Sequence, residues 1–322
     1  MEISYQADFN TKDKGWYVIM LEILVKAGSY VLMIIIGYVM KRAGIFGREA
    51  VKILSNIILM VTLPAAVISS FANYNRQMSL AVLVLFGIFM NLLFIGIGYL
   101  SALRKSNTEK SFGIINYSGY NIGTFAMPYL QNFIGPMGIV VAVLFDTGNA
   151  IMTTGVTYAI ASRFVSNAKF EIAEFIRKVT SSVPFDIYVV MMLLYFMNIR
   201  LPWFIYEVAG NIGRANAFLS MFMIGIVFEI PKNLRQLGDV FKILLIRYSV
   251  SALASIILYS IPIFSLEVRQ ILIILLFSPV SGVNVISTLR CNADVEKSGA
   301  INSISIILSL IIMTLLIQVF GY

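Results

Sequence analysis

Ten apolar stretches constrain this chain more than any other feature, because each is about as long as a membrane span. A helix needs about 20 apolar residues to cross a bilayer. The 322 residues are 59% hydrophobic and 12% charged, whereas soluble domains carry about 25% charged residues. We therefore predict an all-α polytopic membrane protein embedded in the lipid bilayer. The expected spans are residues 17–40, 50–71, 78–100, 112–130, 138–161, 184–198, 209–230, 241–262, 268–289 and 298–320.

Two of these stretches make poor helices, and we call them the first broken stretch (residues 116–128) and the second broken stretch (residues 278–284). Gly119, Gly123 and Pro128 weaken the first, and Pro279 and Gly282 weaken the second. Inside a membrane, irregular backbone persists only where it is buried in protein or lines a wet cavity. Transporters hold their substrates at such breaks near the bilayer midplane, although two kinked helices packed on polar neighbours would give the same pattern. The candidate substrate-binding residues are Asn116, Tyr120, Asn121, Gly123, Thr124, Pro279, Ser281 and Asn284.

Basic residues predict the orientation of the spans, because cytoplasmic loops carry an excess of lysine and arginine. The loops after the second, fourth, sixth and eighth spans hold only Arg76, Arg200 and Arg269. The odd-numbered loops are therefore expected in the cytoplasm and both termini outside. We attribute the net charge of +8 to loops facing anionic lipid and not to nucleic-acid binding. The basic residues of the odd-numbered loops are Lys41, Arg42, Arg48, Lys52, Arg104, Lys105, Lys110, Arg163, Lys169, Arg177, Lys178, Lys232, Arg235, Lys242, Arg290 and Lys297.

A long loop at residues 162–182 divides the spans into five before and five after. Its segment 170–179 is amphipathic and is expected to lie on the cytoplasmic surface. An odd number of spans in each half predicts an inverted-topology repeat, with residues 1–161 and 183–322 as its two halves. A shift of 161 residues places Ser118 over Pro279 and Asn121 over Gly282, so the two broken stretches coincide.

The composition excludes several kinds of catalysis. There is no histidine, which removes Ser-His and Cys-His mechanisms and histidine-ligated metals. The only cysteine, Cys291, cannot form an intramolecular disulfide. An intramembrane aspartyl hydrolase would need two acids facing each other, and Asp146 has no evident partner acid within the spans. A channel would usually need identical subunits around a pore, whereas an inverted repeat predicts alternating access within one chain. We expect neither an enzyme nor a cofactor.

Asp146 is the most isolated acid within the spans. A charge there is costly, so its side chain should face protein or water. Asn149 lies three residues on and shares its helix face. The pair is a candidate site for coupling to a proton or cation, and a structural hydrogen-bonding role is the alternative. Arg247 is expected to snorkel toward the cytoplasmic interface, with pairing to an acid as its alternative.

Several short motifs occur in order over the whole chain. They are Ile36-Gly37-Tyr38, Lys41-Arg42-Ala43-Gly44-Ile45, Leu63-Pro64-Ala65, Asn121 to Pro128 with Gly135 beyond, and Ser278-Pro279. Together they resemble the motifs of the auxin efflux carrier family. The departure is Tyr120, because the plant pattern has a proline before the asparagine.

The resemblance implies a fold like that of bile-acid symporters and sodium/proton antiporters. The first, second, sixth and seventh spans would form a scaffold, through which a homodimer could assemble. The others would form a mobile transport domain in which the fourth and ninth spans cross. Asn121 would correspond to a substrate-contacting asparagine and Pro279 to the proline of the crossing. The implied function is alternating-access transport of small organic anions, auxin-like carboxylates among them, across the cell membrane. A sodium- or proton-coupled carrier is the alternative.

Overall fold

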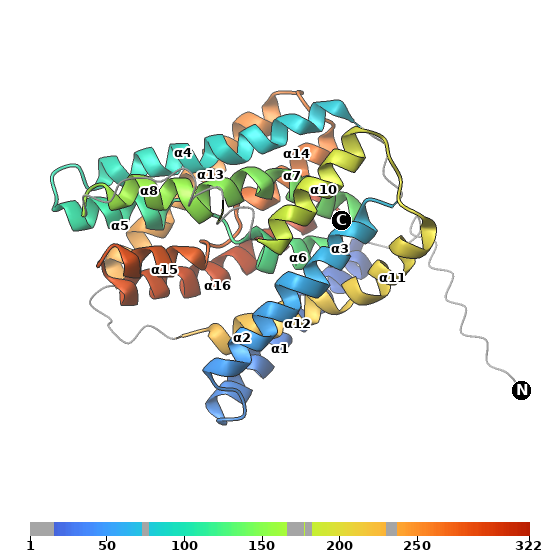
Figure 1. Ribbon diagram of the computed structural model, residues 1–322, viewed down its shortest axis with the longest axis horizontal. Coiled ribbons are helices and arrows are strands. Elements are labelled where there is room, and N and C mark those ends of the chain that lie inside the picture. Colours follow the sequence, from blue (N-terminus) through green and yellow to red (C-terminus); the bar gives the residue numbers. More distant parts are fainter. Residues whose placement is uncertain (1–15, 73–76, 166–176, 178–181, 230–236) are drawn as a thin grey trace, which may run out of the picture.

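The computed structural model describes residues 16–72, 77–165, 177, 182–229 and 237–322, and these ranges are helical without any strand. Most of the amphipathic segment expected at 170–179 lies outside the described residues. Figure 1 shows the helices lying side by side, with α4, α5, α8 and α13 in one group and α1, α2 and α12 in another. The helices of the first half are α1 (Trp16–Arg42), α2 (Arg48–Ile57), η1 (Ile58–Thr62), α3 (Leu63–Ser70), η2 (Met78–Ala81), α4 (Val82–Ser101), α5 (Asn107–Tyr117), η3 (Ile122–Ala126), α6 (Met127–Phe133), α7 (Pro136–Ile151), η4 (Met152–Val156) and α8 (Thr157–Ser162). Those of the second half are α10 (Val183–Phe196), α11 (Trp203–Gly213), α12 (Ala215–Val227), α13 (Leu237–Ser260), α14 (Leu266–Leu276), α15 (Val283–Arg290) and α16 (Val295–Phe320).

Six helices in the described residues are long and apolar enough to cross a membrane. Their number makes this a multi-pass membrane protein, as the composition predicted. The remaining expected spans correspond to shorter helices or to pairs of helices separated by a break. The six are Leu21–Arg42, Glu49–Ser70, Met78–Ser101, Pro136–Ser162, Leu237–Ser260 and Val295–Phe320.

One expected boundary was wrong. The stretch 209–230 was predicted to be a single span, but the helix begins at Trp203, and Arg214 separates α11 from α12. Pro202 stands just before the first turn, where a proline costs no hydrogen bond. The aromatic residues that follow Pro202 belong to this helix. The expected span left them out because it was centred on a run of aliphatic residues.

Prolines in two spans follow a short π-helical turn. The turn η1 comes just before Pro64, and the turn η3 comes just before Pro128. A proline cannot donate a backbone hydrogen bond, so the preceding turn widens and the helix continues beyond it. The effect of Pro64 on its span is therefore a π-helical turn.

Glycines allow two pairs of helices to approach closely. In α4, a Cβ on Gly87 would lie 2.3 Å from the Phe145 carbonyl oxygen of α7, and a Cβ on Gly148 would lie 2.0 Å from the Val84 oxygen. Gly37 of α1 and Gly225 of α12 face each other's helix in the same reciprocal way. Small residues at such contacts are the usual means of packing helices in lipid.

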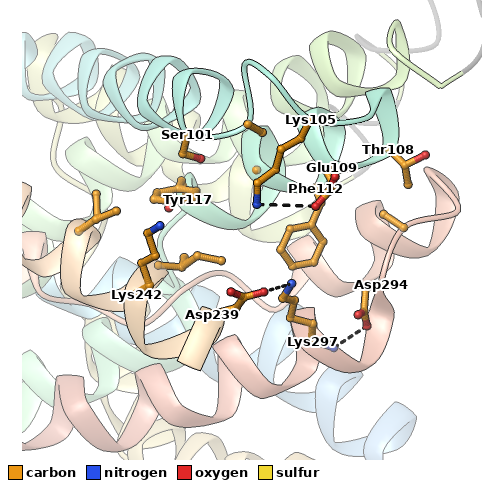
Figure 2. A pocket seen from close by; sticks show the side chains of 15 residues that line it. Ser101, Lys105, Thr108, Glu109, Phe112, Tyr117, Asp239, Lys242, Asp294 and Lys297 are labelled. Atoms are coloured by element: carbon orange, nitrogen blue, oxygen red, sulfur yellow. Dashed lines mark hydrogen bonds and ion pairs between the residues drawn. The ribbon is translucent and has the colours of Figure 1, made fainter. Parts of the chain in front are cut away.

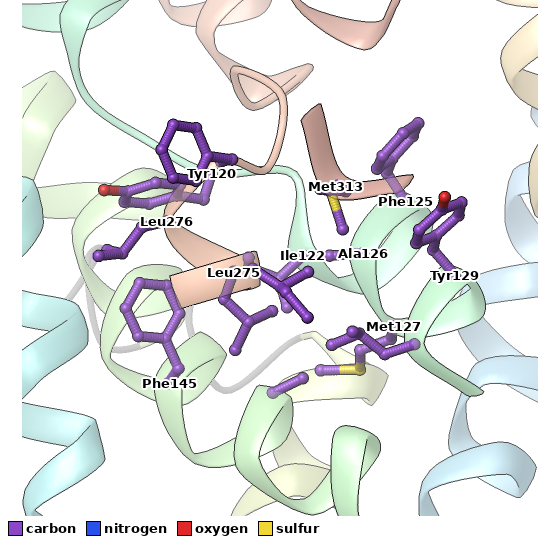
Figure 3. Close-up of a cluster of buried hydrophobic side chains, with 14 of the residues drawn as sticks. Tyr120, Ile122, Phe125, Ala126, Met127, Tyr129, Phe145, Leu275, Leu276 and Met313 are labelled. Carbon is purple, nitrogen blue, oxygen red and sulfur yellow. The ribbon is translucent and has the colours of Figure 1, made fainter. Parts of the chain in front are cut away.

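Helix α7 lies at the centre of the molecule, with every residue from Met137 to Asn149 buried. It contacts α3, α4, α10 and α14. Figure 3 shows Phe145 of α7 in a cluster of buried apolar side chains with Tyr120, Ile122 and Leu275. Because α7 carries Asp146 and Asn149, this core fixes both polar side chains beside the first broken stretch.

Candidate functional site

The two broken stretches meet through their main chains, and we call this contact the crossing. The backbone nitrogen of Asn121 donates to the Pro279 carbonyl oxygen at 2.8 Å. Tyr120 and Val280 form an isolated antiparallel bridge. Residues about 160 positions apart in sequence are therefore joined by backbone hydrogen bonds where both helices are interrupted.

The first interruption depends on Gly119, whose φ of +79° is in the left-handed region. A side chain on that residue would also meet its neighbours, because a Cβ would lie 3.0 Å from Oδ1 of Asn284. Glycine avoids both costs. Helix α5 therefore ends at Tyr117, and the chain turns before η3 begins.

Asn149 of α7 holds the backbone of Tyr120 at the crossing. Its Oδ1 accepts from the Tyr120 nitrogen at 3.0 Å, and its Nδ2 donates to the Tyr120 oxygen at 3.0 Å. Asn91 of α4 donates to the same Oδ1 and accepts from the Gly119 nitrogen. The Tyr120 N–H used here would be missing in the plant pattern, where a proline stands before the asparagine.

Side chains of α16 support the second broken stretch in a similar manner. Ser305 accepts from the Val280 nitrogen at 3.0 Å, and Asn302 donates to the Val280 oxygen at 2.7 Å. Both sides of the Tyr120–Val280 bridge are thus hydrogen-bonded to side chains of a following helix. Buried backbone groups that leave a helix need such partners.

Two of the predicted site residues are engaged within the protein. The amide of Asn116 is buried, donates to Thr288 and accepts from Ser298. Asn284 donates to the carbonyl oxygens of Ile115 and Ser118 at 2.7 Å each. In this conformation both amides stabilise the end of α5.

Asn121, Gly123 and Thr124 are half-buried, in contrast to their neighbours. The Thr124 hydroxyl donates to Oδ1 of Asn121 at 2.5 Å, while no described hydrogen bond uses the side-chain Nδ2 of Asn121. In the second stretch, Pro279 and Ser281 are buried and Gly282 is exposed, with open space around its Cα. The crossing therefore exposes a free amide donor beside the first turns of η3 and α15.

Asp146 lies against the first broken stretch from the side of α7. Its carboxylate accepts from Nδ2 of Asn149 at 2.7 Å and from the Tyr188 hydroxyl of α10. A Cβ on Gly123 would lie 3.1 Å from the Tyr188 oxygen and 3.6 Å from Oδ2 of Asp146. Asp146 and Asn149 share one face of α7, as predicted, and the contact of the Asp146 carboxylate with Tyr188 joins α7 to α10.

The snorkelling predicted for Arg247 was wrong. Its side chain is 0% exposed and donates to the carbonyl oxygens of Tyr117 and Gly119. Within the described ranges it forms no ion pair with an acid. It lies deep enough in α13 to reach the crossing, so its aliphatic stem does not carry it to the interface.

A cavity lies away from the crossing, between α4, α5, α13 and the start of α16. Its volume is about 450 Å³, and Figure 2 shows charged side chains around it. Lys297 and Asp239 pair across it at 2.8 Å, and Lys105 pairs with Glu109 at 3.7 Å. Tyr117 forms its end nearest the crossing, and Asn121 does not line it.

Four residues of this site were not anticipated from the sequence: Asn91, Tyr188, Asn302 and Ser305. Asn91 gives the clearest signal, because it is an isolated amide within the apolar helix α4. Tyr188 carries no such signal, because tyrosines also populate the membrane interface. Asn302 and Ser305 belong to a long series of polar residues in α16 that sequence alone does not rank.

The profile of a family described as membrane transport protein matches residues 26–178. This match begins within α1 and extends beyond α8, so it contains the first broken stretch, Asp146 and Asn149. Over this part, which is just under half of its length, the chain is similar to this family. The match confirms the resemblance to auxin efflux carriers found in the motifs.

Two archaeal relatives of this chain are described as uncharacterized transporters. One, from Methanothermobacter thermautotrophicus, is 25% identical over 130 residues, covering 39% of this chain and 43% of the relative. The other, from Methanocaldococcus jannaschii, is 25% identical over 213 residues, covering 63% of this chain and 68% of the relative. The alignment thus spans less than half the length of the first relative.

Proposed function

We propose that this membrane transport protein is a secondary carrier of small organic anions, with carboxylates as substrates. The observation that carries the proposal is the crossing, where Asn121 is half-buried and its side-chain Nδ2 has no hydrogen-bond partner in the described structure. A carboxylate accepts hydrogen bonds from such a donor without a fixed charge next to it. The helix starts at η3 and α15 add backbone N–H groups and the positive ends of helix dipoles.

We further propose that the chain works by alternating access between two inverted halves. The first half would hold α1 to α8 and the second α10 to α16. Scaffold helices α1 to α3 and α10 to α12 would carry a homodimer contact. The remaining helices would move the crossing between the two sides of the cell membrane, with both termini outside. Supporting this division, α1 packs on α12 while α4 packs on α5 and α7.

A coupled carrier is the second form of the proposal, and the environment of Asp146 favours it. Its carboxylate is 7% exposed, lies beside Gly123 and contacts α10 through Tyr188. A proton or sodium ion bound there would act close to the substrate. The coupling ion would then be set by Asp146 and Asn149, with no further cofactor.

The proposal is tested by Asn121→Ala in purified protein. A panel of mono- and dicarboxylates is first screened for thermal stabilisation of the wild type, with and without sodium and over a range of pH. Asn121→Ala should lose at least tenfold in affinity for the carboxylate that stabilises best, because a hydrogen bond to a charged group contributes about 1.5–3 kcal/mol. Uptake of the same compound into proteoliposomes should fall with it.

Asn107→Ala is the matched control, because Asn107 is an exposed asparagine at the start of α5. It should bind and transport as the wild type does. Equal affinity in Asn121→Ala and Asn107→Ala would remove Asn121 from the site. A wild type that no member of the panel stabilises would contradict carboxylates as the substrate class.

A further inference from the structure

Arg247 carries a charge that nothing acidic neutralises in the described structure. It is the largest of the fully buried side chains, and the described ion pairs do not include it. A buried charge is costly unless hydrogen bonds and other contacts compensate it. An arginine kept at this cost at the centre of a membrane protein is therefore expected to have a function, and we look for that function at the crossing.

The guanidinium group is held by the first broken stretch itself. One amino group donates to the Tyr117 oxygen and the other to the Gly119 oxygen, the latter at 2.8 Å. These carbonyls end α5, where the helix dipole is negative. The guanidinium carbon also lies 4.5 Å from the Tyr120 ring centre and 4.9 Å from that of Phe94. These contacts fix Arg247 without removing its charge.

The titratable groups around Arg247 are tyrosines. Tyr120 and Tyr248 are the groups that interact with it electrostatically. Asp146 approaches the crossing from α7, where its partners are Asn149 and Tyr188. The Asp146 carboxylate therefore does not pair with Arg247, although it contributes to the potential at Gly123.

The charge lies close to the candidate substrate donor. Gly119 and Asn121 are two residues apart, so the guanidinium lies within about 10 Å of the Asn121 side chain. At that distance, with an effective dielectric constant of about 20, a positive charge favours a monovalent anion by about tenfold over a neutral molecule. The same charge disfavours a cation by a similar factor.

We propose that Arg247 determines the charge specificity of the crossing: it positions the end of α5 and supplies the uncompensated positive charge that selects anions. The selection of a substrate rests on the proposed transport function, whereas the potential at Asn121 does not. The class of ligand favoured is a singly charged carboxylate over its neutral amide.

The potential can be measured without knowing the substrate. Asn121→Cys is made in full-length Cys291→Ala protein and treated in detergent with two methanethiosulfonates of similar size. One reagent carries a sulfonate and the other a trimethylammonium group. The ratio of their reaction rates reports the local potential, because the reactivity of the thiol cancels. Cys291 is 0% exposed and burial raises the pKa of its thiol, so its removal eliminates only a slow background.

With Arg247 present, the ratio of anionic to cationic rates should be at least about tenfold above that of 2-mercaptoethanol in solution. Arg247→Gln should lower it about tenfold, and Arg247→Lys should largely keep it. A purely structural role predicts that Lys and Gln change the ratio equally, if at all. At Asn107→Cys, far from the crossing, the ratio should not respond to Arg247→Gln.

Two results would overturn the inference. The first is a ratio of anionic to cationic reaction rates near that of 2-mercaptoethanol in the protein that keeps Arg247. This result does not depend on whether an Arg247 variant folds. The second is a ratio unchanged by Arg247→Gln in folded protein. Failure of carboxylates to bind, together with a ratio that responds to Arg247, would count against the proposed function and leave the charge role of Arg247 standing.

Discussion

Asn149 shows how one side chain can stabilise an interrupted helix. Its amide makes two bonds to the backbone of Tyr120, one with Asn91 and one with Asp146. It thereby uses both ends of its hydrogen-bonding capacity in a buried place. Asp146 is thus tied to the crossing through Asn149, and a change at its carboxylate acts directly on the first broken stretch.

Asp146→Asn tests coupling at this site. The substitution keeps the size of the side chain and can keep the bonds to Asn149 and Tyr188, but it can no longer exchange a proton or hold a cation by charge. We expect uptake to lose its dependence on pH or sodium, while counter-flow exchange continues at the wild-type rate. Exchange needs binding and alternating access but no net ion movement.

The control for this experiment is Asp186→Asn, since Asp186 is an exposed acid in the first turn of α10. It should leave both assays unchanged. If Asp146→Asn accumulates substrate with the pH and sodium dependence of the wild type, Asp146 only packs and forms hydrogen bonds.

Among individual residues, the sequence predicted those that break a helix but not those that compensate the break. Gly119, Gly123 and Pro279 are recognisable because glycine and proline alter the backbone wherever they occur. Arg247 and Asn91 act across space on atoms more than 25 positions away. Their partners depend on helix packing, which the order of residues in one span does not specify.

At the scale of helices, the second interruption should depend on Pro279. Pro279→Ala restores a backbone donor and allows α14 to continue toward α15. We expect the variant to fold but to transport at less than a tenth of the wild-type rate. Pro262→Ala, at an exposed proline beyond the end of α13, is the matched control. Wild-type transport by Pro279→Ala would assign the interruption to Gly282.

The close approach of α4 and α7 gives a prediction on stability. In Gly87→Ala, the new methyl group would meet the Phe145 oxygen, so the two helices must move apart. We expect this to cost about 1–3 kcal/mol, as overpacking does, and to lower the melting temperature in detergent.

Gly96→Ala is the same substitution in the same helix, but no atom lies within 4 Å of the new Cβ. It should be neutral or slightly stabilising, because alanine favours a helix more than glycine does. Equal melting temperatures for the two variants would show that α4 and α7 do not pack as described.

At the scale of the whole molecule, orientation is the property to test. Single cysteines in the Cys291→Ala background at Asn107 and Asn198 lie on either side of the membrane by the distribution of basic residues. In intact cells, an impermeant maleimide should label Asn198→Cys directly and Asn107→Cys only after permeabilisation. Labelling of both from the same side would refute the alternation of the loops.

The helical class and the multi-pass character followed from the apolar stretches, because lipid leaves few alternatives. Most boundaries were also close; the first expected span, 17–40, corresponds to Trp16–Arg42. The separation of α11 from α12 at Arg214 was not predicted, although Gly213 stands directly before it. The pairing of Tyr120 with Val280 could not be predicted from the sequence either, because it depends on how two distant helices cross.

That pairing is made by peptide groups, which are the same in every residue except proline, and this affects how such a carrier can evolve. Side chains around Asn121, Thr124 and Ser281 can be exchanged without breaking the main-chain bond between the stretches. Under the proposed function, new substrates could thus be acquired by substitutions that leave the framework intact. In this way a transporter lineage can retain one architecture while its chemical preferences diverge.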